Sequence, residues 1–293
     1  MNASLKLVQQ GRSGPAAALR AGMATLRDHW PEYLMEAWGL GLLMLVAAAA
    51  GALLPPSVPH AWQRIAVGGA VAVTAAALVY SRWGRQSGAH FNPAMTFTFF
   101  MLGKVRPWDA VFYAVFQIAG AAAGLLVAAL CFGDALRRPP VEWLATYPTG
   151  MRAALPFMAE FLASFVVMSL VLSMGGAVRI ARYTGLASAA ASLVFSLFEV
   201  QATSFSLNPA HSLVSAVPSG HWDGVWIYLL APPAGMLLAA FVNSQVVPLP
   251  PMLCAKLMHD GSTRCIHCGF RPIRPQALGS ALPPASVPPS APG

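Results

Sequence analysis

The sequence predicts an all-α polytopic membrane protein with six transmembrane helices and two re-entrant half-helices in an inverted repeat. The first observation is composition: 57% of the 293 residues are hydrophobic and only 10% are charged, whereas soluble domains carry about 25% charged residues. The second is that the tripeptide Asn-Pro-Ala occurs twice, at 92–94 and at 208–210. Each copy opens an apolar run that is too short to cross a bilayer.

Six longer apolar runs supply the predicted transmembrane helices, because each approaches or exceeds the roughly 20 residues needed to span the hydrocarbon. Pro55 and Pro56 end the first run, and Pro232 and Pro233 predict a kink inside the last one. The runs cover about residues 33–54, 62–80, 108–132, 155–174, 183–200 and 222–247.

The two short runs, at about 93–102 and 209–217, are predicted to be half-helices. Proline suits the first position of a helix because its missing N–H would be unpaired there, and asparagine is a favoured N-cap. At membrane depth, half-helices are tolerated only where they are buried in protein or line a cavity. We therefore expect both of them to lie inside the bundle.

The basic residues predict the orientation in the membrane. If the loops alternate across six spans, fourteen of the 18 Lys and Arg residues fall on the side that holds both termini. By the positive-inside rule, both termini are expected in the cytoplasm, with the protein in the cell inner or plasma membrane. The net charge of +8 then follows from topology, so no nucleic-acid partner is expected.

This layout divides the chain into three parts. A basic cytoplasmic tail is expected over 1–31, and the membrane domain over 32–247. A second cytoplasmic tail, with Cys and His residues followed by a Pro-rich end, is expected over 248–293.

The membrane domain consists of two repeats, at about 32–132 and 155–247. Each repeat contains an early glutamate (Glu36 or Glu160), a second span, an Asn-Pro-Ala half-helix and a third span. Because three spans is an odd number, the second repeat is inverted relative to the first. Inverted repeats whose broken helices meet near the midplane are a transport architecture.

These motifs resemble those of the major intrinsic protein family, the aquaporins and glycerol facilitators. The resemblance extends over about residues 32–247 and rests on SGAHFNPAMT, on LNPAHS, on the two glutamates, on QIAGAAAG in the third span and on APPAG in the sixth. It implies an aquaporin-like fold with one hourglass pore per subunit, assembled as a homotetramer in membrane lipid. It also implies passage of water or small neutral solutes.

The resemblance places both tripeptides at the centre of the pore. Two helix N-termini that face each other carry about half a positive charge each, which repels cations and hydronium. The asparagine amides are expected to donate hydrogen bonds to a passing molecule. A water held at its oxygen points its hydrogens away, which interrupts proton transfer. The residues concerned are Asn92, Pro93, Ala94, Asn208, Pro209 and Ala210.

Three further residues are expected to support the pore. Glutamates inside spans are costly and therefore have a role, and the resemblance implies that Glu36 and Glu160 accept hydrogen bonds from the loops that lead into the half-helices. His90 lies on the cytoplasmic approach, where it either lines the pore or supports the loop.

The expected selectivity filter departs from the family pattern. The family nearly always has Arg after the second tripeptide, and this chain has His211. Alignment with the other constriction positions gives Ala72, Ser196 and Phe205. Small side chains and a titratable imidazole predict a wider constriction that passes small neutral solutes larger than water. Glycerol facilitators usually carry Asp at the next position, which here is Ser212, so a plain glycerol facilitator is not expected.

The second tail contains a group of soft metal ligands: Cys254, His259, Cys265 and Cys268. Thiolate and imidazole suit zinc. Three interpretations stay open: a zinc site, a redox-active thiol pair, and reduced thiols without a function. No other cofactor is expected.

A passive channel is the predicted function. The alternative is a closed or non-conducting adhesion or sensor protein of the membrane, with a metal- or redox-responsive Cys tail as its working part. An enzyme is not expected, because no nucleophile is accompanied by a base and an orienting group. The intramembrane carboxylates also lie one per repeat rather than together.

Overall fold

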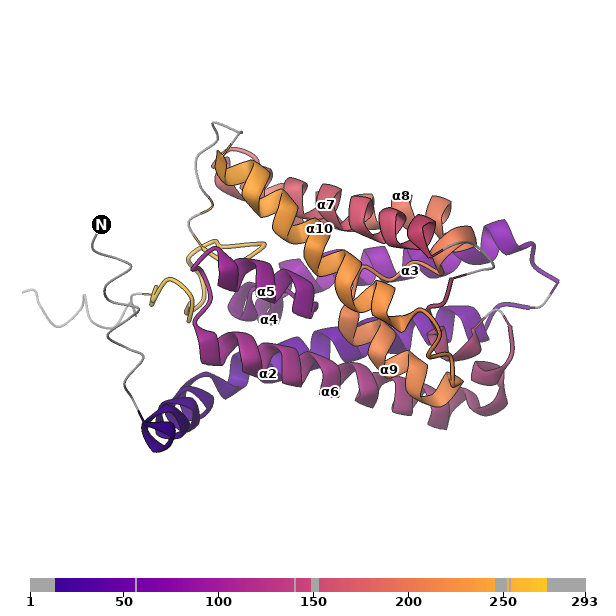
Figure 1. The fold of residues 1–293 in the computed structure, drawn as a ribbon, viewed down its shortest axis with the longest axis horizontal. Helices are drawn as coiled ribbons and strands as arrows, with labels where there is room; N and C mark the ends of the chain where they lie inside the picture. The colour runs from indigo at the N-terminus through magenta and orange to yellow at the C-terminus, as the bar shows by residue number, and fades with distance from the viewer. Residues whose placement is uncertain are drawn as a thin grey trace, which may run out of the picture.

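The computed structural model of the chain is a bundle of long helices that surrounds two short ones (Figure 1). The structure describes residues 14–55, 57–139, 141–148, 153–245, 252 and 254–272. Within these ranges the secondary structure is entirely helical, with no β-strand.

The first repeat contains three long helices and one half-helix, α5, together with a short helix, α4, that the sequence did not predict. Its elements are α2 (Pro15–Ala52), α3 (His60–Tyr80), α4 (Arg82–Ser87), α5 (Pro93–Met101) and α6 (Pro107–Phe132). A connection with two short 3-10 helices, η1 (Gly133–Arg137) and η2 (Glu142–Leu144), leads to the second repeat.

The second repeat has the same order of elements, and α9 is its half-helix. Its elements are α7 (Ala154–Gly176), η3 (Ala181–Tyr183), α8 (Thr184–Thr203), α9 (Pro209–Ser219) and α10 (Val225–Gln245). The described residues therefore form six long helices and two half-helices, and the predicted fold class is confirmed.

Within the part of the chain that the structure describes, five helices are long enough and apolar enough to cross a membrane: α2, α3, α6, α7 and α10. One face of α8 is polar, because Ser188, Ser192 and Ser196 recur every four residues and line the central cavity. Since α8 packs between α3 and α7, its polar face does not meet lipid.

The first helix begins earlier than expected. Residues 15–31, assigned above to a tail, form the first turns of α2, with Pro15 at its N-terminus and Pro31 inside it. These turns are held against α6, because His29 Nδ1 lies 2.7 Å and the Tyr33 hydroxyl 2.6 Å from a carboxylate oxygen of Asp109. The expected tail is thus helical over at least half its length; residues 1–13, like the Pro-rich end, lie outside the described residues.

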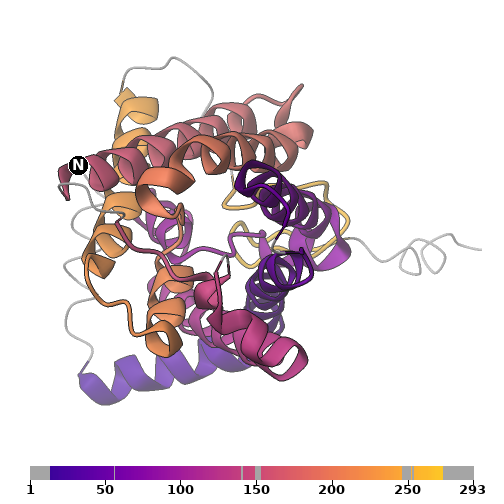
Figure 2. The same ribbon diagram turned by 90° about the vertical axis from the view of Figure 1, so that its right-hand side faces the viewer.

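The two ends of the bundle differ. The tail side is the end where α2 begins, α3 ends and residues 254–272 lie; the loop side is the opposite end, which carries residues 133–148. Figure 1 shows residues 254–272 in yellow beside α4 and α5, and Figure 2 shows the same segment behind the ring of long helices, as seen from the loop side. Ala255 and Leu257 of this segment are buried in the main apolar core.

Equivalent glycines allow the closest helix crossings in the two repeats. In the first, α2 packs along α6, and a Cβ on Gly120 would lie 2.1 Å from the carbonyl oxygen of Ala37. In the second, α7 packs along α10, and a Cβ on Gly235 would lie 2.2 Å from the carbonyl oxygen of Phe161. Both distances are far below van der Waals contact, so these crossings require glycine.

Candidate channel

A cavity of about 630 Å³ occupies the centre of the bundle. On the loop side it is lined by Tyr147 and His60, in the middle by both motif asparagines, and on the tail side by Val79 and Leu257. Most of the wall is contributed by α2, α3, α8 and the two loops that precede the half-helices. The cavity therefore extends along the bundle axis past both Asn-Pro-Ala motifs.

Both motif asparagines cap their half-helices, as the sequence predicts. Asn92 Oδ1 accepts a hydrogen bond from the backbone N–H of Ala94 at 2.8 Å, and Asn208 Oδ1 accepts one from Ala210 at 3.1 Å. A proline follows each asparagine as the first helical residue. The two N-termini therefore point toward the middle of the cavity from opposite ends.

The side-chain amides also link the repeats. Asn92 Nδ2 donates to the carbonyl of Leu207 at 2.7 Å, and Asn208 Nδ2 donates to the carbonyl of Phe91 at 2.8 Å. Each amide carries two hydrogens, and these bonds use one of them. Because both asparagines line the cavity, the second hydrogen of each remains available to a molecule inside it.

Glu36 is fully buried and organises the first of these loops. Its carboxylate accepts hydrogen bonds from the backbone N–H groups of His90 (3.1 Å) and Phe91 (2.6 Å). It also accepts bonds from the Ser87 hydroxyl at 2.7 Å and the Gln117 amide at 2.9 Å. A charge buried in this way is satisfied by four donors, as such groups must be.

Glu160 has the same arrangement in the second repeat. It is fully buried and accepts hydrogen bonds from the backbone N–H groups of Ser206 (2.9 Å) and Leu207 (2.8 Å). In both repeats the two backbone donors are the two residues immediately before the motif asparagine. Phe91 (φ 47°) and Leu207 (φ 54°) both have left-handed backbone conformations, which cost about 1–3 kcal/mol each unless the surroundings hold them.

His90 both lines the cavity and supports the loop, the two roles that the sequence left open. It lines the cavity, yet it is buried, and both ring nitrogens are bonded. Nε2 donates to the carbonyl of Ala255 at 2.7 Å, which leaves Nδ1 to accept from the Thr96 hydroxyl at 3.0 Å. The ring also stacks on Phe99, with 5.0 Å between centroids. His90 therefore joins the first loop to the half-helix and to the C-terminal segment.

The four expected filter residues, Ala72, Ser196, Phe205 and His211, all line the cavity. His211 Nε2 donates to the carbonyl of Leu144 in η2 at 3.1 Å, so the imidazole is fixed against the loop-side connection. The helices that carry Ala72 and Ser196 approach closely, since a Cβ on Gly68 would lie 2.8 Å from Ser196 Oγ.

Two parts of the cavity wall were not predicted. Arg64 and Gly68 lie eight and four residues before Ala72 and line the same face of α3, so helical periodicity would have found them. The loop-side connection also lines the cavity, through Glu142 and Tyr147 among others, and carries no motif. The Tyr147 hydroxyl donates to Glu142 at 2.5 Å. This bond, with partial burial, raises the pKa of Tyr147 to about 12.

The remaining predicted group lies outside the cavity. Cys254, His259, Cys265 and Cys268 come together in the C-terminal segment, and their donor atoms all lie within 4.8 Å of one another. The structure thus brings together all four predicted ligands on the tail side of the bundle.

The fold and the cavity define a helical integral membrane protein with an inverted repeat and a central cavity between two half-helices. The family model for the major intrinsic protein matches residues 23–243, so the chain belongs to the major intrinsic protein family.

Individual relatives agree with this assignment. The chain is 32% identical to the aquaporin NIP1-2 of Oryza sativa subsp. japonica over 71% of its own length and 66% of that protein. It is 34% identical to the rice aquaporin NIP1-4 over 73% of its own length and 72% of that protein. The match thus spans about two thirds of the length of the first of these relatives.

The fold is also similar to a solved structure, that of the aquaglyceroporin from Plasmodium falciparum. The TM-score is 0.63 at 20% sequence identity, and the match covers 75% of this chain and 97% of the other. At this identity the likeness concerns the fold alone.

Proposed function

We propose that this protein is a passive channel for water and small uncharged solutes. The observation that carries the proposal is the cavity that passes both Asn-Pro-Ala motifs, with one free amide hydrogen of each asparagine available to it. Family membership supports a channel rather than an enzyme.

The half-helices supply the basis for excluding ions. Their N-termini, capped by Asn92 and Asn208, each carry about half a positive charge at the middle of the cavity. A cation at this point would be repelled and would also lose its hydration. A neutral molecule that accepts both amide hydrogens is held at its acceptor atom, so a water there points its own hydrogens outward and does not relay a proton.

The loop-side wall determines which solutes enter. Ala72 and Ser196 are small, and His211 occupies the position at which the family carries an arginine. Arg64 supplies a fixed positive charge to the same cavity from a different helix. This combination suits neutral solutes larger than water while keeping a barrier to cations.

Osmotic experiments on proteoliposomes test the proposal. Stopped-flow measurements of vesicle shrinkage and swelling should show that proteoliposomes are more permeable to water, glycerol and urea than empty vesicles are. Ala72→Trp places a large ring in the cavity and should abolish permeation, whereas Val73→Trp should not, because Val73 is 72% exposed on the outside of α3. A wild-type chain that conducts no solute under any condition would favour the alternative of a closed adhesion or sensor protein.

We further propose that the channel is a homotetramer whose termini face the cytoplasm of the cell inner or plasma membrane. The excess of basic residues on the tail side supports this orientation. Exposed apolar residues on the outer surface, among them Leu130 and Phe198, supply area for lipid and for neighbouring subunits. Native mass spectrometry and protease accessibility in oriented vesicles would test the two parts separately.

A further inference from the structure

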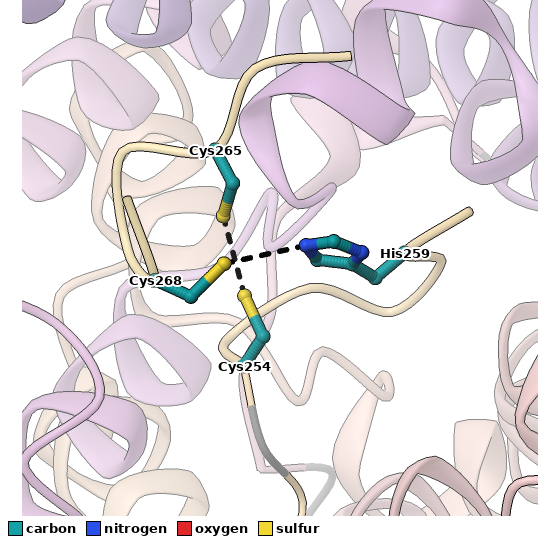
Figure 3. A group of neighbouring side chains, drawn as sticks. All are labelled: Cys254, His259, Cys265 and Cys268. Carbon is teal, nitrogen blue, oxygen red and sulfur yellow. Dashed lines mark hydrogen bonds between the residues drawn. The ribbon is translucent and has the colours of Figure 1, made fainter. Parts of the chain in front are cut away.

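The C-terminal segment holds four soft ligands around one point. In Figure 3 the side chains of Cys254, His259, Cys265 and Cys268 point toward a common centre. The two buried sulfurs, those of Cys254 and Cys265, are 3.3 Å apart, and His259 Nε2 lies 3.4 Å from the Cys268 sulfur. All four donor atoms lie within 4.8 Å of one another.

This geometry fits a single tetrahedral ion. Zinc binds sulfur at about 2.3 Å and imidazole nitrogen at about 2.0 Å, so neighbouring ligand atoms in a tetrahedron are about 3.5–3.8 Å apart. Three thiolates and one imidazole fill all four positions, which is typical of a structural site. The nearby carboxylate of Asp260 is engaged elsewhere, since it accepts from Arg85 Nη1 at 2.6 Å.

The segment needs such a constraint. The described residues 254–272 contain neither helix nor strand, yet Ala255 and Leu257 are buried. A short irregular segment has little core of its own, and a bound metal compensates for the entropy lost when it becomes ordered.

The same segment covers the tail-side end of the cavity. The backbone N–H of Leu257 donates to the carbonyl of Gly88 at 3.1 Å, and the carbonyl of Ala255 accepts from His90 at 2.7 Å. Leu257 lines the cavity itself. Since Cys254 precedes these two residues and His259 follows them, an ion bound by both would fix the loop that carries Leu257.

A salt bridge, hydrogen bonds and a ring stack also attach the segment to the bundle. The guanidinium of Arg264 forms a bidentate salt bridge with the buried carboxylate of Glu32, with N···O distances of 2.7 and 2.6 Å. Lys256 Nζ donates to the carbonyls of Arg85 and Arg264 at 2.7 and 2.9 Å. The ring of His267 stacks on that of His90, with 5.6 Å between centroids.

We propose that Cys254, His259, Cys265 and Cys268 bind one Zn²⁺, and that the bound ion holds residues 254–270 closed over the tail-side end of the channel. The metal site stands on its own geometry, whereas the closing role rests on the proposed channel function. Loss of the ion would free the loop that carries Leu257 and open the cavity to the tail side.

Metal analysis of the full chain tests the site. Purified protein should carry roughly one zinc per chain, and the double variant Cys265→Ser/Cys268→Ser should lose it. Cys131→Ser is the matched control, because Cys131 is an exposed cysteine on α6, and it should leave the zinc content unchanged. A wild-type chain that takes up no zinc even after incubation with the ion, or whose intact mass shows a disulfide among these cysteines, would overturn the site.

Permeation measurements test the closing role. A membrane-permeant zinc chelator should raise solute flux of the wild-type protein several-fold, and added zinc should reverse the rise; the double variant should show high flux with or without chelator. Hydrogen exchange of residues 254–270 should increase in parallel. Zinc binding without any change in flux would overturn the closing role alone. Zinc binding without flux in either state would leave the site intact and overturn the channel function on which the closing role rests.

Discussion

The side-chain amide of Asn92 donates to the carbonyl of Leu207, 2.7 Å away in the opposite repeat, and Asn208 makes the equivalent bond to Phe91. Each half-helix is therefore tied to the loop that leads into the other. In each repeat the same asparagine side chain both caps its half-helix and forms the hydrogen bond that joins the repeats. The two N-termini are consequently positioned as a pair.

Asn208→Asp separates these two roles. Aspartate caps a helix as well as asparagine does, but its carboxylate has no hydrogen for the carbonyl of Phe91. We expect a lower melting temperature in detergent, by an amount that corresponds to about 1–3 kcal/mol, and reduced water flux. Asn243→Asp is the control, since Asn243 donates only to Ser173 Oγ in the described structure, at 3.2 Å. If Asn208→Asp and Asn243→Asp proved equally stable, the bond from Asn208 to the carbonyl of Phe91 would not stabilise the pair of half-helices.

Glu36→Gln and Glu160→Gln should each lower both stability and permeation. Each carboxylate accepts two backbone N–H bonds, and a bond to a charged group contributes about 1.5–3 kcal/mol. A glutamine turns an N–H group toward one of these donors, so at least one bond is lost. Thermal unfolding followed by fluorescence would measure the change. Asp134→Asn, at an exposed site next to Arg137, should have little effect.

Gly120→Ala and Gly235→Ala should destabilise the two main helix crossings. The new Cβ atoms would meet backbone carbonyl oxygens at 2.1 and 2.2 Å, and a backbone atom cannot move aside as a flexible side chain does. Overpacking of this kind costs about 1–3 kcal/mol. Gly69→Ala is a control in a helix where nothing lies within 4 Å of the added Cβ. It should be neutral or stabilising by thermal unfolding.

His211→Arg should narrow the range of solutes. A longer, permanently charged side chain would extend into the wall that Ala72 and Ser196 leave open. Glycerol and urea flux should fall more than water flux in stopped-flow measurements. A uniform fall for all three solutes would instead indicate a general loss of folded protein, which the melting temperature would reveal.

Much of the fold was predictable because its signals are local. Hydrophobic runs mark the long helices, and the Asn-Pro pair marks the start of each half-helix by the same capping chemistry that the structure shows. The early start of α2 was not predicted, because its stabilisation depends on Asp109, a distant residue to which His29 and Tyr33 bond.

Some residues of the candidate site were likewise predictable from local motifs, and others were not. Asn92, Asn208 and the four filter positions lie on the cavity as expected from motif and alignment. The contribution of Glu142 could not be foreseen, because its loop has left-handed backbone conformations and no recurring motif. The burial of Leu257 in the tail-side end was equally hidden, since it depends on contacts with Gly88 more than 160 residues earlier in the chain.

The face of α8 that lines the cavity has a consequence for how a solute moves. Ser188, Ser192 and Ser196 recur every four residues, which separates successive hydroxyls by about 6 Å along the helix axis. A polar molecule that leaves one hydroxyl meets the next after travelling roughly two of its own diameters, so dehydration at the entrance is compensated stepwise rather than at a single binding site. Such a wall favours rapid transit over tight binding.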